Sequence, residues 1–460
     1  MIDQIAKVNM SYLIELLKDV EFANKQYEFL MRFLHEKKCL FKNKPFPTLL
    51  KPHFISPQQT RILVYAVEKI SSALAKFIDL YLRDEEVRRL MGFRDVQNAL
   101  FSIDLGYSMP LVLTRLDAFI DDYTLKFLEF NCDSPAGMSY SEIVELGFQQ
   151  VLKQYPVLNE WKVEYLNMNQ RVLDVLLDSY DEFRSKKPSF PERPTIAIVD
   201  WEGVSTSAEF DILKGYFERK GYETIITFPQ KLTINRGRME ADGEPVHLIY
   251  KRVITRELLE RLDEVEMFIQ GIRDGLACVC NPFSTNIVGN KKVLALLTEP
   301  RFQHIFDEEE LEVINRTIPW TKTLVEQEVT YRGTTAGLKD IVIGNKDTLV
   351  LKPASSYGGK DVFLGVQTDT GTWNKLVEKN IALGNWVVQE YVDIPEEVFP
   401  VLGKDACIQL KKVNINPYSF RGNYCGSMTR FSDSSIINVS QGGGLVPTMC
   451  VADMETVLDD

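Results

Sequence analysis

Residues 347–366 read "DTLVLKPASSYGGKDVFLGV" and join two apolar runs through a loop of serine, glycine and lysine. The two runs predict strands, the first of which ends near Lys352. Glycines let a backbone approach a ligand closely, its N–H groups can then bind phosphate oxygens, and lysines neutralise their charge. A GxxxxGK[ST] loop leading into a helix is absent. We therefore expect either a plain hairpin or a flap that closes over ATP, formed by Ser356, Gly358 and Gly359, with Lys360 as a further candidate.

The segment after this loop predicts a partner strand. "NWVVQEYVDIPEE" (385–397) contains a short apolar run followed by Gln389, Glu390 and Tyr391. The backbone at these three residues could offer an adenine one hydrogen-bond donor and one acceptor.

Two further segments carry candidate residues. Upstream, "NPFSTNIVGNKKVLALL" (281–297) predicts a helix that begins at Lys291. Downstream, "YCGSMTRFSDSSIINVSQGGGLVPT" (424–448) predicts a region of short strands that holds Arg430, Asn438 and the glycines 442–444. Asn438 and the glycines could line a substrate cleft, and a tight structural turn explains the glycines equally well.

Composition and charge narrow the class of protein. The chain has 460 residues, and 53 Lys and Arg against 65 Asp and Glu give a formal net charge of −12, which repels phosphate backbones and makes nucleic acid an unexpected partner. The seven scattered cysteines and the lack of a signal-peptide pattern predict a cytoplasmic protein with reduced thiols. Four isolated histidines form no metal or triad motif, so we expect chemistry that does not depend on histidine.

Hydrophobic patterns divide the chain into four regions. We expect a helical N-terminal region at 1–104, a segment with strands and helices at 105–193, a small doubly wound layer at 194–290, and short strands with glycine-rich turns towards the end of 291–460. "KKPSFPERP" (186–194) is charged and proline-rich enough to be a boundary. No GxGxxG follows the first strand of the layer, so a dinucleotide site is not supported there.

A polar alternation in "LEFNCDSPAG" (128–137) suggests a cation site. Glu129 and Asn131 are two residues apart on a predicted strand and therefore share one face. Mg²⁺ takes oxygen ligands, usually from one or two carboxylates and from substrate phosphates. A strand that simply ends in a turn is the other interpretation, because Asn, Asp, Ser, Pro and Gly are common turn formers. We expect Asp133 to belong to the following turn, although the alternation would let it lie just behind the cation ligands.

Taken together and in this order, the segments resemble the ATP-grasp ligases, and within them the circularly permuted branch that includes glutathionylspermidine synthetase and related bacterial proteins. The motifs that carry the resemblance span about residues 110 to 445: "TRLDAFIDDYTLKFLEFNCDSPAG", "NPF", "GNKKVLALL", "LVLKPASSYGGKDVFLG", "VVQEYV" and "MTRFSDSSIINVSQGGG". In unpermuted members the metal-binding carboxylate and asparagine follow the lysine flap. Here "LEFN" precedes "LVLKP", so this order predicts a circularly permuted ATP-grasp fold of mixed α/β class.

The resemblance also implies roles for individual residues. Asp117 matches the first metal carboxylate of the family by its spacing of twelve residues from Glu129, and Arg115 matches its phosphate-contacting arginine. Lys291 and Lys352 are expected to bind ATP phosphates, and Arg430 to steady the reacting centre. A surface ion pair of Arg115 with the two carboxylates is the alternative.

The register of the hairpin around Asp121 to Tyr123 tests this grouping. A two-residue loop, Asp121-Asp122, would place Asp117 opposite Lys126 and away from Glu129. A three-residue loop, Asp121 to Tyr123, would place Arg115 opposite Glu129 and put all the polar residues on one face. We predict the three-residue loop.

The implied activity is ATP- and Mg²⁺-dependent formation of an amide or peptide bond between an acid and an amine, through an acyl phosphate. An ATP-dependent phosphotransferase and a catalytically silent nucleotide-binding protein are the alternatives. Substrate recognition is expected to fall to the 194–290 layer. The first hundred residues look too short for the amidase domain that bifunctional family members carry, so we expect no amidase activity. The sequence does not indicate the two substrates or the oligomeric state.

Overall fold

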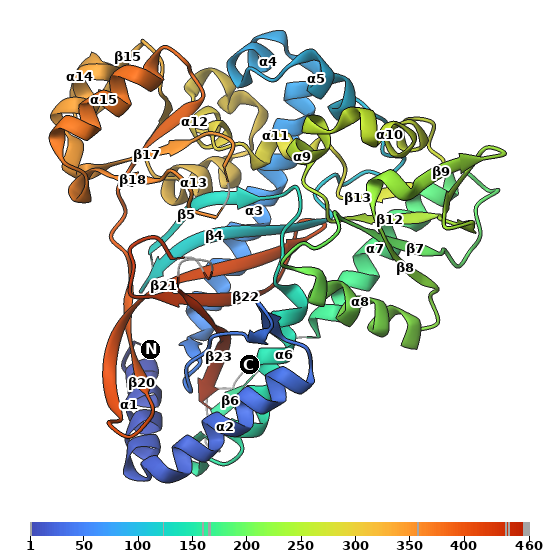
Figure 1. Cartoon of the computed structure of the whole chain (residues 1–460). Helices are drawn as coiled ribbons and strands as arrows, with labels where there is room; N and C mark the ends of the chain where they lie inside the picture. Colours follow the sequence, from blue (N-terminus) through green and yellow to red (C-terminus); the bar gives the residue numbers. More distant parts are fainter. Residues whose placement is uncertain are drawn as a thin grey trace.

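The computed structural model describes residues 2–122, 124–158, 161–163, 167–356, 358–437, 439 and 442–453. It has a mixed α/β fold with three main sheets (Figure 1). A central, mostly antiparallel sheet lies between a parallel sheet and a smaller antiparallel sheet, each with its own helices. No helix in the described ranges is long and apolar enough to span a membrane.

The central sheet holds the strands that carry most candidate residues. Its strand order is β3-β23-β22-β21-β4-β5, with β20 paired to β21 and β6 paired to β23. The bounds are β3 (His53–Ile55), β4 (Leu113–Asp121), β5 (Thr124–Asn131), β6 (Trp161–Val163), β20 (Glu396–Val401), β21 (Cys407–Phe420), β22 (Asn423–Ser432) and β23 (Gly444–Asp453). Because β21 has 14 residues and β22 and β23 have 10 each, these three strands are longer than the short strands expected towards the end of the chain.

The parallel sheet forms the doubly wound layer that the sequence predicts. Its order is β13-β12-β7-β8, and every neighbouring pair is parallel. The strands are β7 (Ile196–Val199), β8 (Thr224–Thr227), β12 (Leu248–Lys251) and β13 (Cys278–Cys280). Helix α8 (Ser207–Arg219) connects β7 to β8 as expected for a βαβ unit. Alternate residues of β7 enter two different cores, so both faces of the sheet are covered.

The smaller antiparallel sheet carries the glycine loop. Its order is β14-β19-β17-β18, with β14 (Thr321–Thr323), β17 (Leu349–Pro353), β18 (Phe363–Leu364) and β19 (Trp386–Glu390). Helices α14 (Leu338–Gly344) and α15 (Thr370–Ile381) pack on it around Trp373. The sequence analysis missed α15, although its N-cap Asp369 and the apolar spacing of Trp373, Val377 and Ile381 signal a helix.

The N-terminal region is helical, with a small hairpin between its helices. The helices are α1 (Ile2–Lys18), α2 (Val20–Glu36), α3 (Pro57–Arg83), α4 (Glu85–Met91) and α5 (Asp95–Phe101), and the hairpin is β1 (Leu40–Phe41) with β2 (Lys44–Pro45). Ser56 caps α3 and Pro57 occupies its first turn, which is a local helix-start signal. The apolar residues of α3 that recur every three or four positions, from Leu63 to Tyr81, are buried.

The remaining elements connect these layers. They include α6 (Met138–Leu152), α7 (Met168–Ser185), α9 (Thr255–Glu260), α10 (Glu266–Arg273), α11 (Thr285–Gly289), α12 (Lys292–Leu297) and α13 (Glu308–Thr317). There are also two small sheets. One consists of β9 (Leu232–Asn235), β10 (Arg238–Ala241) and β11 (Glu244–Pro245), and the other consists of β15 (Glu328–Tyr331) and β16 (Thr334–Gly337).

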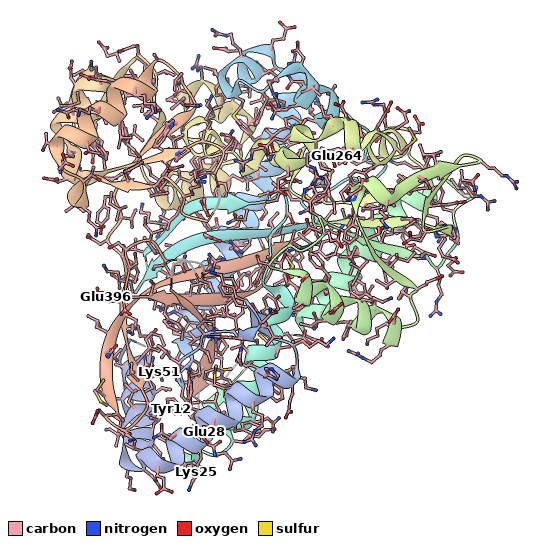
Figure 2. The ribbon with its side chains drawn as sticks, viewed as in Figure 1. Tyr12, Lys25, Glu28, Lys51, Glu264 and Glu396 are labelled. Atoms are coloured by element: carbon pink, nitrogen blue, oxygen red, sulfur yellow. The ribbon has the colours of Figure 1, made fainter. Side chains whose placement is uncertain are left out.

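Buried polar side chains fasten the layers to one another. The Asn281 amide donates to the carbonyl of Leu113 at 2.6 Å and accepts from its N–H at 2.9 Å, which ties the parallel layer to β4. Asp133 accepts from the Lys251 ammonium at 2.6 Å, so its role is structural. Near the N-terminal helices the fully buried Lys51, labelled in Figure 2, forms an ion pair with Glu397 of β20. All seven cysteines are free, and Cys278 and Cys280 lie in a buried strand.

Candidate active site

The β4–β5 hairpin places Arg115, Asp117, Glu129 and Asn131 on one face of the central sheet, with a strand register different from the one predicted. Asp121 pairs with Thr124, so two residues connect the strands and the predicted three-residue loop is wrong. A bulge at Leu128 then shifts the register by one residue. As a result Asp117 lies opposite Glu129, and Arg115 lies opposite Asn131.

Asp117 is held between two arginines. The guanidinium of Arg115 donates to both carboxylate oxygens of Asp117, at 2.7 and 3.2 Å, and Arg430 of β22 donates at 3.3 Å. The side chain of Asp117 is 6% exposed, so the paired charges are largely removed from water. Burial and the nearby Arg115 lower the pKa of Arg430. The interpretation as a surface ion pair is therefore wrong, because this cluster is buried.

Glu129 faces two lysines that come from other elements. Its carboxylate lies 3.0 Å from the ammonium of Lys291, which precedes α12. Burial alone would raise the pKa of Glu129, but the charges of Lys291 and Lys352 overcome this and lower it to about 2. Burial lowers the pKa of Lys352 to about 8, although Glu129 opposes the shift. The sequence-predicted lysines and carboxylate thus meet in one electrostatic cluster.

The strand residues predicted to contact adenine already have hydrogen-bond partners within the protein. Gln389 is buried and accepts from the Lys352 ammonium at 2.6 Å, while its amide donates to Thr321 at 3.0 Å, so it positions Lys352. The backbone N–H groups of Glu390 and Tyr391 donate to carbonyls within the protein, at 2.7 and 2.8 Å. The prediction of free backbone donors at these two residues is therefore wrong, although both still line the cavity described next.

A cavity of about 580 Å³ lies between the central sheet and the smaller antiparallel sheet. One side carries the charged residues of β4, β5 and β22, and the other carries Lys352 and the glycine loop. Apolar side chains complete its walls, among them Val350, Leu364 and Ile436. Gly358 and Gly359 line it with positive φ of 73° and 70°, which glycine adopts readily.

Other predicted residues lie apart from this cavity. Lys360 is exposed and does not line it. The glycines 442–444 do not line it either. A Cβ at Gly444 would lie 2.2 Å from the Phe431 ring, so close packing explains the glycine at this position. Asn438 lies outside the described residues. Sequence reasoning missed Asn414, which pairs with Arg430 across β21 and β22 and lines the cavity.

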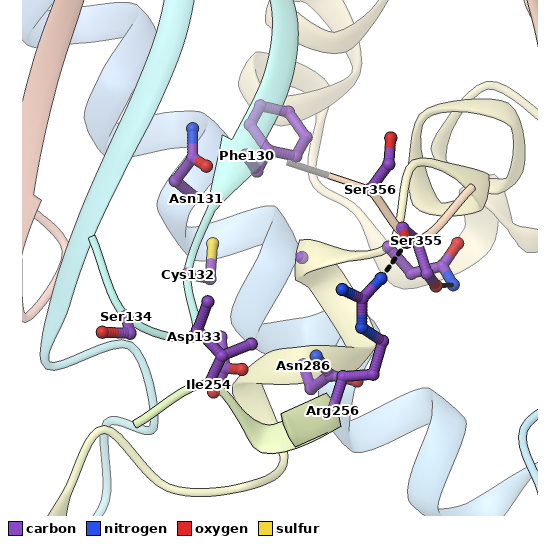
Figure 3. A pocket seen from close by; sticks show the side chains of 12 residues that line it. Phe130, Asn131, Cys132, Asp133, Ser134, Ile254, Arg256, Asn286, Ser355 and Ser356 are labelled. Atoms are coloured by element: carbon purple, nitrogen blue, oxygen red, sulfur yellow. Dashed lines mark hydrogen bonds between the residues drawn. The ribbon is translucent and has the colours of Figure 1, made fainter. Parts of the chain in front are cut away.

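A smaller cavity of about 110 Å³ adjoins the first one at Asn131. Figure 3 shows Asn131 on one side and the loop residues Ser355 and Ser356 on the other. The backbone carbonyl of Ser356 accepts from the Lys291 ammonium at 2.7 Å, which holds the start of the glycine loop against α12. The amide nitrogen of Asn131 is buried and has no hydrogen-bond partner within the described ranges.

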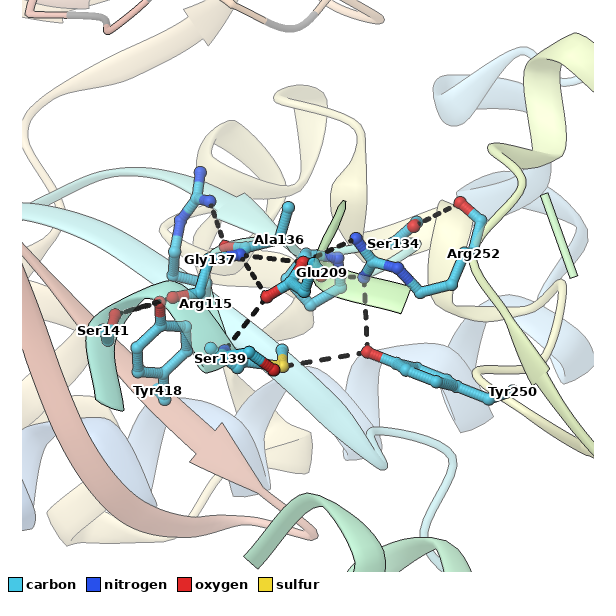
Figure 4. A network of polar contacts seen from close by, with 12 residues as sticks. Arg115, Ser134, Ala136, Gly137, Ser139, Ser141, Glu209, Tyr250, Arg252 and Tyr418 are labelled. Carbon is cyan, nitrogen blue, oxygen red and sulfur yellow. Dashed lines mark hydrogen bonds and ion pairs between the residues drawn. The ribbon is translucent and has the colours of Figure 1, made fainter. Parts of the chain in front are cut away.

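A buried ion pair supports the loop between β5 and α6 (Figure 4). Glu209 of α8 accepts from the N–H groups of Gly137 and Ser139, at 3.0 and 3.1 Å, and pairs with Arg252 at 3.4 Å. The same loop offers the carbonyl of Ala136 to Arg115 at 3.1 Å. No local sequence signal distinguishes Glu209 from a solvated residue of an amphipathic helix.

The donor set on the sheet face fits a divalent cation. Asp117, Glu129 and Asn131 all offer side-chain oxygens, which Mg²⁺ prefers, and Glu129 is ionised at neutral pH. Among the described residues no group of three or more His, Cys, Asp or Glu side chains could hold a metal ion, so the third ligand of this set is the asparagine.

Comparison with known proteins supports the fold. No protein-family model and no curated protein sequence matches the chain. The structure is similar to that of a glutathione synthetase-like effector from Globodera pallida, with a TM-score of 0.64, 11% sequence identity, and coverage of 94% of this chain and 98% of that chain. A "putative gamma-glutamylcysteine synthetase" from Methylobacillus flagellatus matches with a TM-score of 0.41 and 11% identity over 87% of this chain and 90% of that one. The chain thus shares a mixed α/β, glutathione synthetase-like fold with the first of these.

Proposed function

We propose that the chain is an ATP- and Mg²⁺-dependent ligase that joins a carboxylic acid to an amine. One observation carries the proposal: a cavity of about 580 Å³, bordered by the glycine loop, is lined by Glu129 and Lys352 together with the Arg115, Asp117 and Arg430 cluster. Lys291 pairs with Glu129 at the same place. The likeness in fold to a glutathione synthetase-like protein supports the same class of reaction, as an analogy.

The lysines and the glycine loop form the proposed phosphate site. Lys352 has a pKa of about 8 in a buried position, so a bound triphosphate would compensate a charge that the protein alone stabilises poorly. Lys291 already bonds to the start of the loop, because its ammonium donates to the carbonyl of Ser356 at 2.7 Å. Apolar residues such as Val350 and Leu364 offer a surface for the base.

The sheet face forms the proposed metal and transfer site. Asp117, Glu129 and Asn131 would hold Mg²⁺, which when bound neutralises charge on the phosphates. Arg115 and Arg430 keep a permanent charge and a planar fork suited to phosphate and carboxylate oxygens. Both already contact Asp117, so the protein holds them ready at the edge of the cavity.

The proposed reaction has two steps. An oxygen of the substrate carboxylate attacks the γ-phosphorus of ATP, the bond to the β-phosphate oxygen breaks, and ADP leaves. The neutral amine then attacks the acyl carbon, orthophosphate leaves, and the amine loses a proton as the amide forms. The arginines and lysines stabilise the charge on the moving phosphoryl group, and a closed loop would exclude water from the acyl phosphate.

The chain order of the motifs supports a circular permutation, which we include in the proposal together with small-molecule substrates and a cytoplasmic location.

The test is phosphate release from Mg-ATP in the presence of pooled acids, peptides and amines. A ligase releases phosphate only when an acid and an amine are both present, and Glu129→Ala lowers this rate by about 100-fold or more. Glu244→Ala, which alters an exposed glutamate on β11, serves as the matched control and leaves the rate unchanged. Stable phosphorylation of one compound without orthophosphate would mean a phosphotransferase. ATP binding without turnover above the Glu129 variant would favour the silent binder.

A further inference from the structure

Two asparagines lie on the sheet face that carries the proposed transfer site. Asn414 and Asn416 are two residues apart on β21, so their side chains share one face of the strand. Asn414 is the cross-strand partner of Arg430 on β22, and the same face therefore carries both of these side chains. Asn414 and Arg430 both line the cavity of about 580 Å³. An amide thus lies beside a guanidinium on the wall of this cavity.

Asn416 fixes the orientation of the Asn414 amide. Asn416 is fully buried, and its side-chain nitrogen donates to the backbone carbonyls of Asn414 and Met428, at 3.1 and 3.3 Å. A carbonyl can only accept, so these contacts identify the nitrogen of the Asn416 amide. The same nitrogen also donates to the side-chain oxygen of Asn414 at 3.2 Å. The oxygen of the Asn414 amide therefore faces Asn416, and its nitrogen takes the other position.

The side-chain nitrogen of Asn414 keeps a hydrogen for a ligand. An amide nitrogen carries two hydrogens. Within the described ranges this nitrogen has one acceptor, the side-chain oxygen of Asn416 at 3.5 Å, which is longer than the usual N–H···O distance of about 2.7–3.2 Å. Because both polar atoms of the planar Asn414 amide face Asn416, its second N–H bond points away from Asn416. Asn414 is 7% exposed and lines the cavity, so an oxygen of a bound ligand can accept from this group.

The charges on this wall indicate which ligand suits the donor. Arg115 and Arg430 both line the cavity and both donate to Asp117. Two positive charges and one negative charge leave a net charge of +1 on this cluster, and Asn414 adds a donor without adding a charge. A ligand that carries negative charge on oxygen fits these donors, whereas an ammonium group would be repelled.

We propose that Asn414 is a catalytic residue of the ligase, whose side-chain amide donates a hydrogen bond, beside Arg430, to an oxygen of the phosphoryl group that passes from ATP to the acid. Asn416 is the positioning residue that turns the amide nitrogen of Asn414 outward. No bond forms or breaks at Asn414, and it neither gains nor loses a proton. Its hydrogen bond strengthens as negative charge develops on the phosphoryl oxygens. The inference rests on the proposed function, because it adds a residue to the same site.

Steady-state kinetics in the pooled assay test the role of Asn414. Asn414→Ala removes the amide. Asn414→Asp keeps the shape and the oxygen that faces Asn416, but it replaces the donating nitrogen with an acceptor. We expect each variant to lower kcat by about 100-fold, as for the loss of one donor to a transition-state charge, and to change KM for ATP by less than about twofold. KM is spared because the γ-phosphate meets Asn414 only as it moves to the acid.

Asn380→Ala is the matched control. Asn380 is also a buried asparagine, with an amide that donates to the carbonyl of Leu376 at 2.8 Å, but it lies on α15 and does not line the cavity. This variant should keep the kcat and KM of the wild type.

Calorimetry with orthophosphate in the presence of Mg-ADP gives a readout that needs no turnover. Orthophosphate carries the same oxygens as the transferred group. We expect Asn414→Ala to bind it about tenfold more weakly than the wild type, the lower end for a hydrogen bond to a charged group. Asn380→Ala should bind it as the wild type does.

The inference is overturned if the wild type binds no orthophosphate, or if Asn414→Ala binds it as tightly as the wild type. A rise in KM for ATP as large as the fall in kcat would also overturn it, because Asn414 would then act in nucleotide binding. Phosphate release that depends on Glu129, with an unchanged kcat in both Asn414 variants, would retain the ligase and reject Asn414 as a catalytic residue. Orthophosphate binding that depends on Asn414, without phosphate release from any pool, would retain the oxyanion site and reject the ligase.

Discussion

Replacing Glu129 with glutamine tests the charge cluster of the candidate active site. Glutamine keeps the shape and an acceptor oxygen but removes the charge that faces Lys291 and Lys352. The pKa of Glu129 is lowered from 4.5 to about 2 in the folded chain. At about 1.4 kcal/mol for each pH unit, this lowering corresponds to roughly 3 kcal/mol of stabilisation.

The sign of the effect sets its pH dependence. Glu129 is more acidic in the folded chain than in the unfolded chain, so its contribution is complete above its unfolded pKa and is lost as the pH falls from about 4.5 towards about 2. At pH 7 we expect Glu129→Gln to lower the free energy of opening of β5 by roughly 3 kcal/mol. At pH 3 the difference from the wild type should shrink to about 1 kcal/mol.

Backbone hydrogen exchange is the suitable assay, because it reports local stability in a chain of several layers. Exchange of the β5 amides is compared between the wild type and Glu129→Gln at both pH values, with β8 of the parallel sheet as an internal reference. A difference that is constant between pH 7 and pH 3, or that grows at pH 3, would refute the reasoning. It would mean that Glu129 acts by packing rather than by its charge.

Three further perturbations follow from the described contacts. Bound phosphates would raise the pKa of Lys352 from about 8, so ATP binding near pH 8 should be accompanied by proton uptake. Calorimetry in two buffers of different ionisation enthalpy should detect this uptake in the wild type and not in Lys352→Met. Gly137→Ala should cost roughly 1–2 kcal/mol in urea unfolding, because Gly137 has a φ of +101° and a Cβ would lie 3.2 Å from the Tyr418 hydroxyl; an unchanged midpoint would contradict this. Glu209→Ala leaves Arg252 buried without its carboxylate and should lower the free energy of unfolding by about 3–5 kcal/mol. Glu209→Gln should lower it by less. Equal losses of thermal stability in the two variants would contradict a charge effect.

Local chemistry explains why much of the fold could be predicted. The capping of α3 by Ser56 and Pro57, the βαβ unit of the parallel sheet, and the loop with Gly358 and Gly359 depend on residues that are close in sequence. The alternation of Glu129 and Asn131 places both on one face in any extended strand, whatever its partner. Helix α15 could have been predicted in the same way, since its cap and apolar spacing are also local.

Contacts between distant segments decided the rest. The bulge at Leu128 aligns Asp117 with Glu129, because side chains on both faces of the hairpin compete for burial and the turn alone does not set the register. Arg430 contacts Asp117 because β21 pairs with the strands of both residues, β22 on one side and β4 on the other, in one sheet. Glu209 caps the loop before α6 from another layer. The sequence by itself determined which residues are charged and which segments form turns and strands. Only the tertiary structure decided which charges meet, because burial and pairing energies depend on neighbours that lie hundreds of residues apart in the chain.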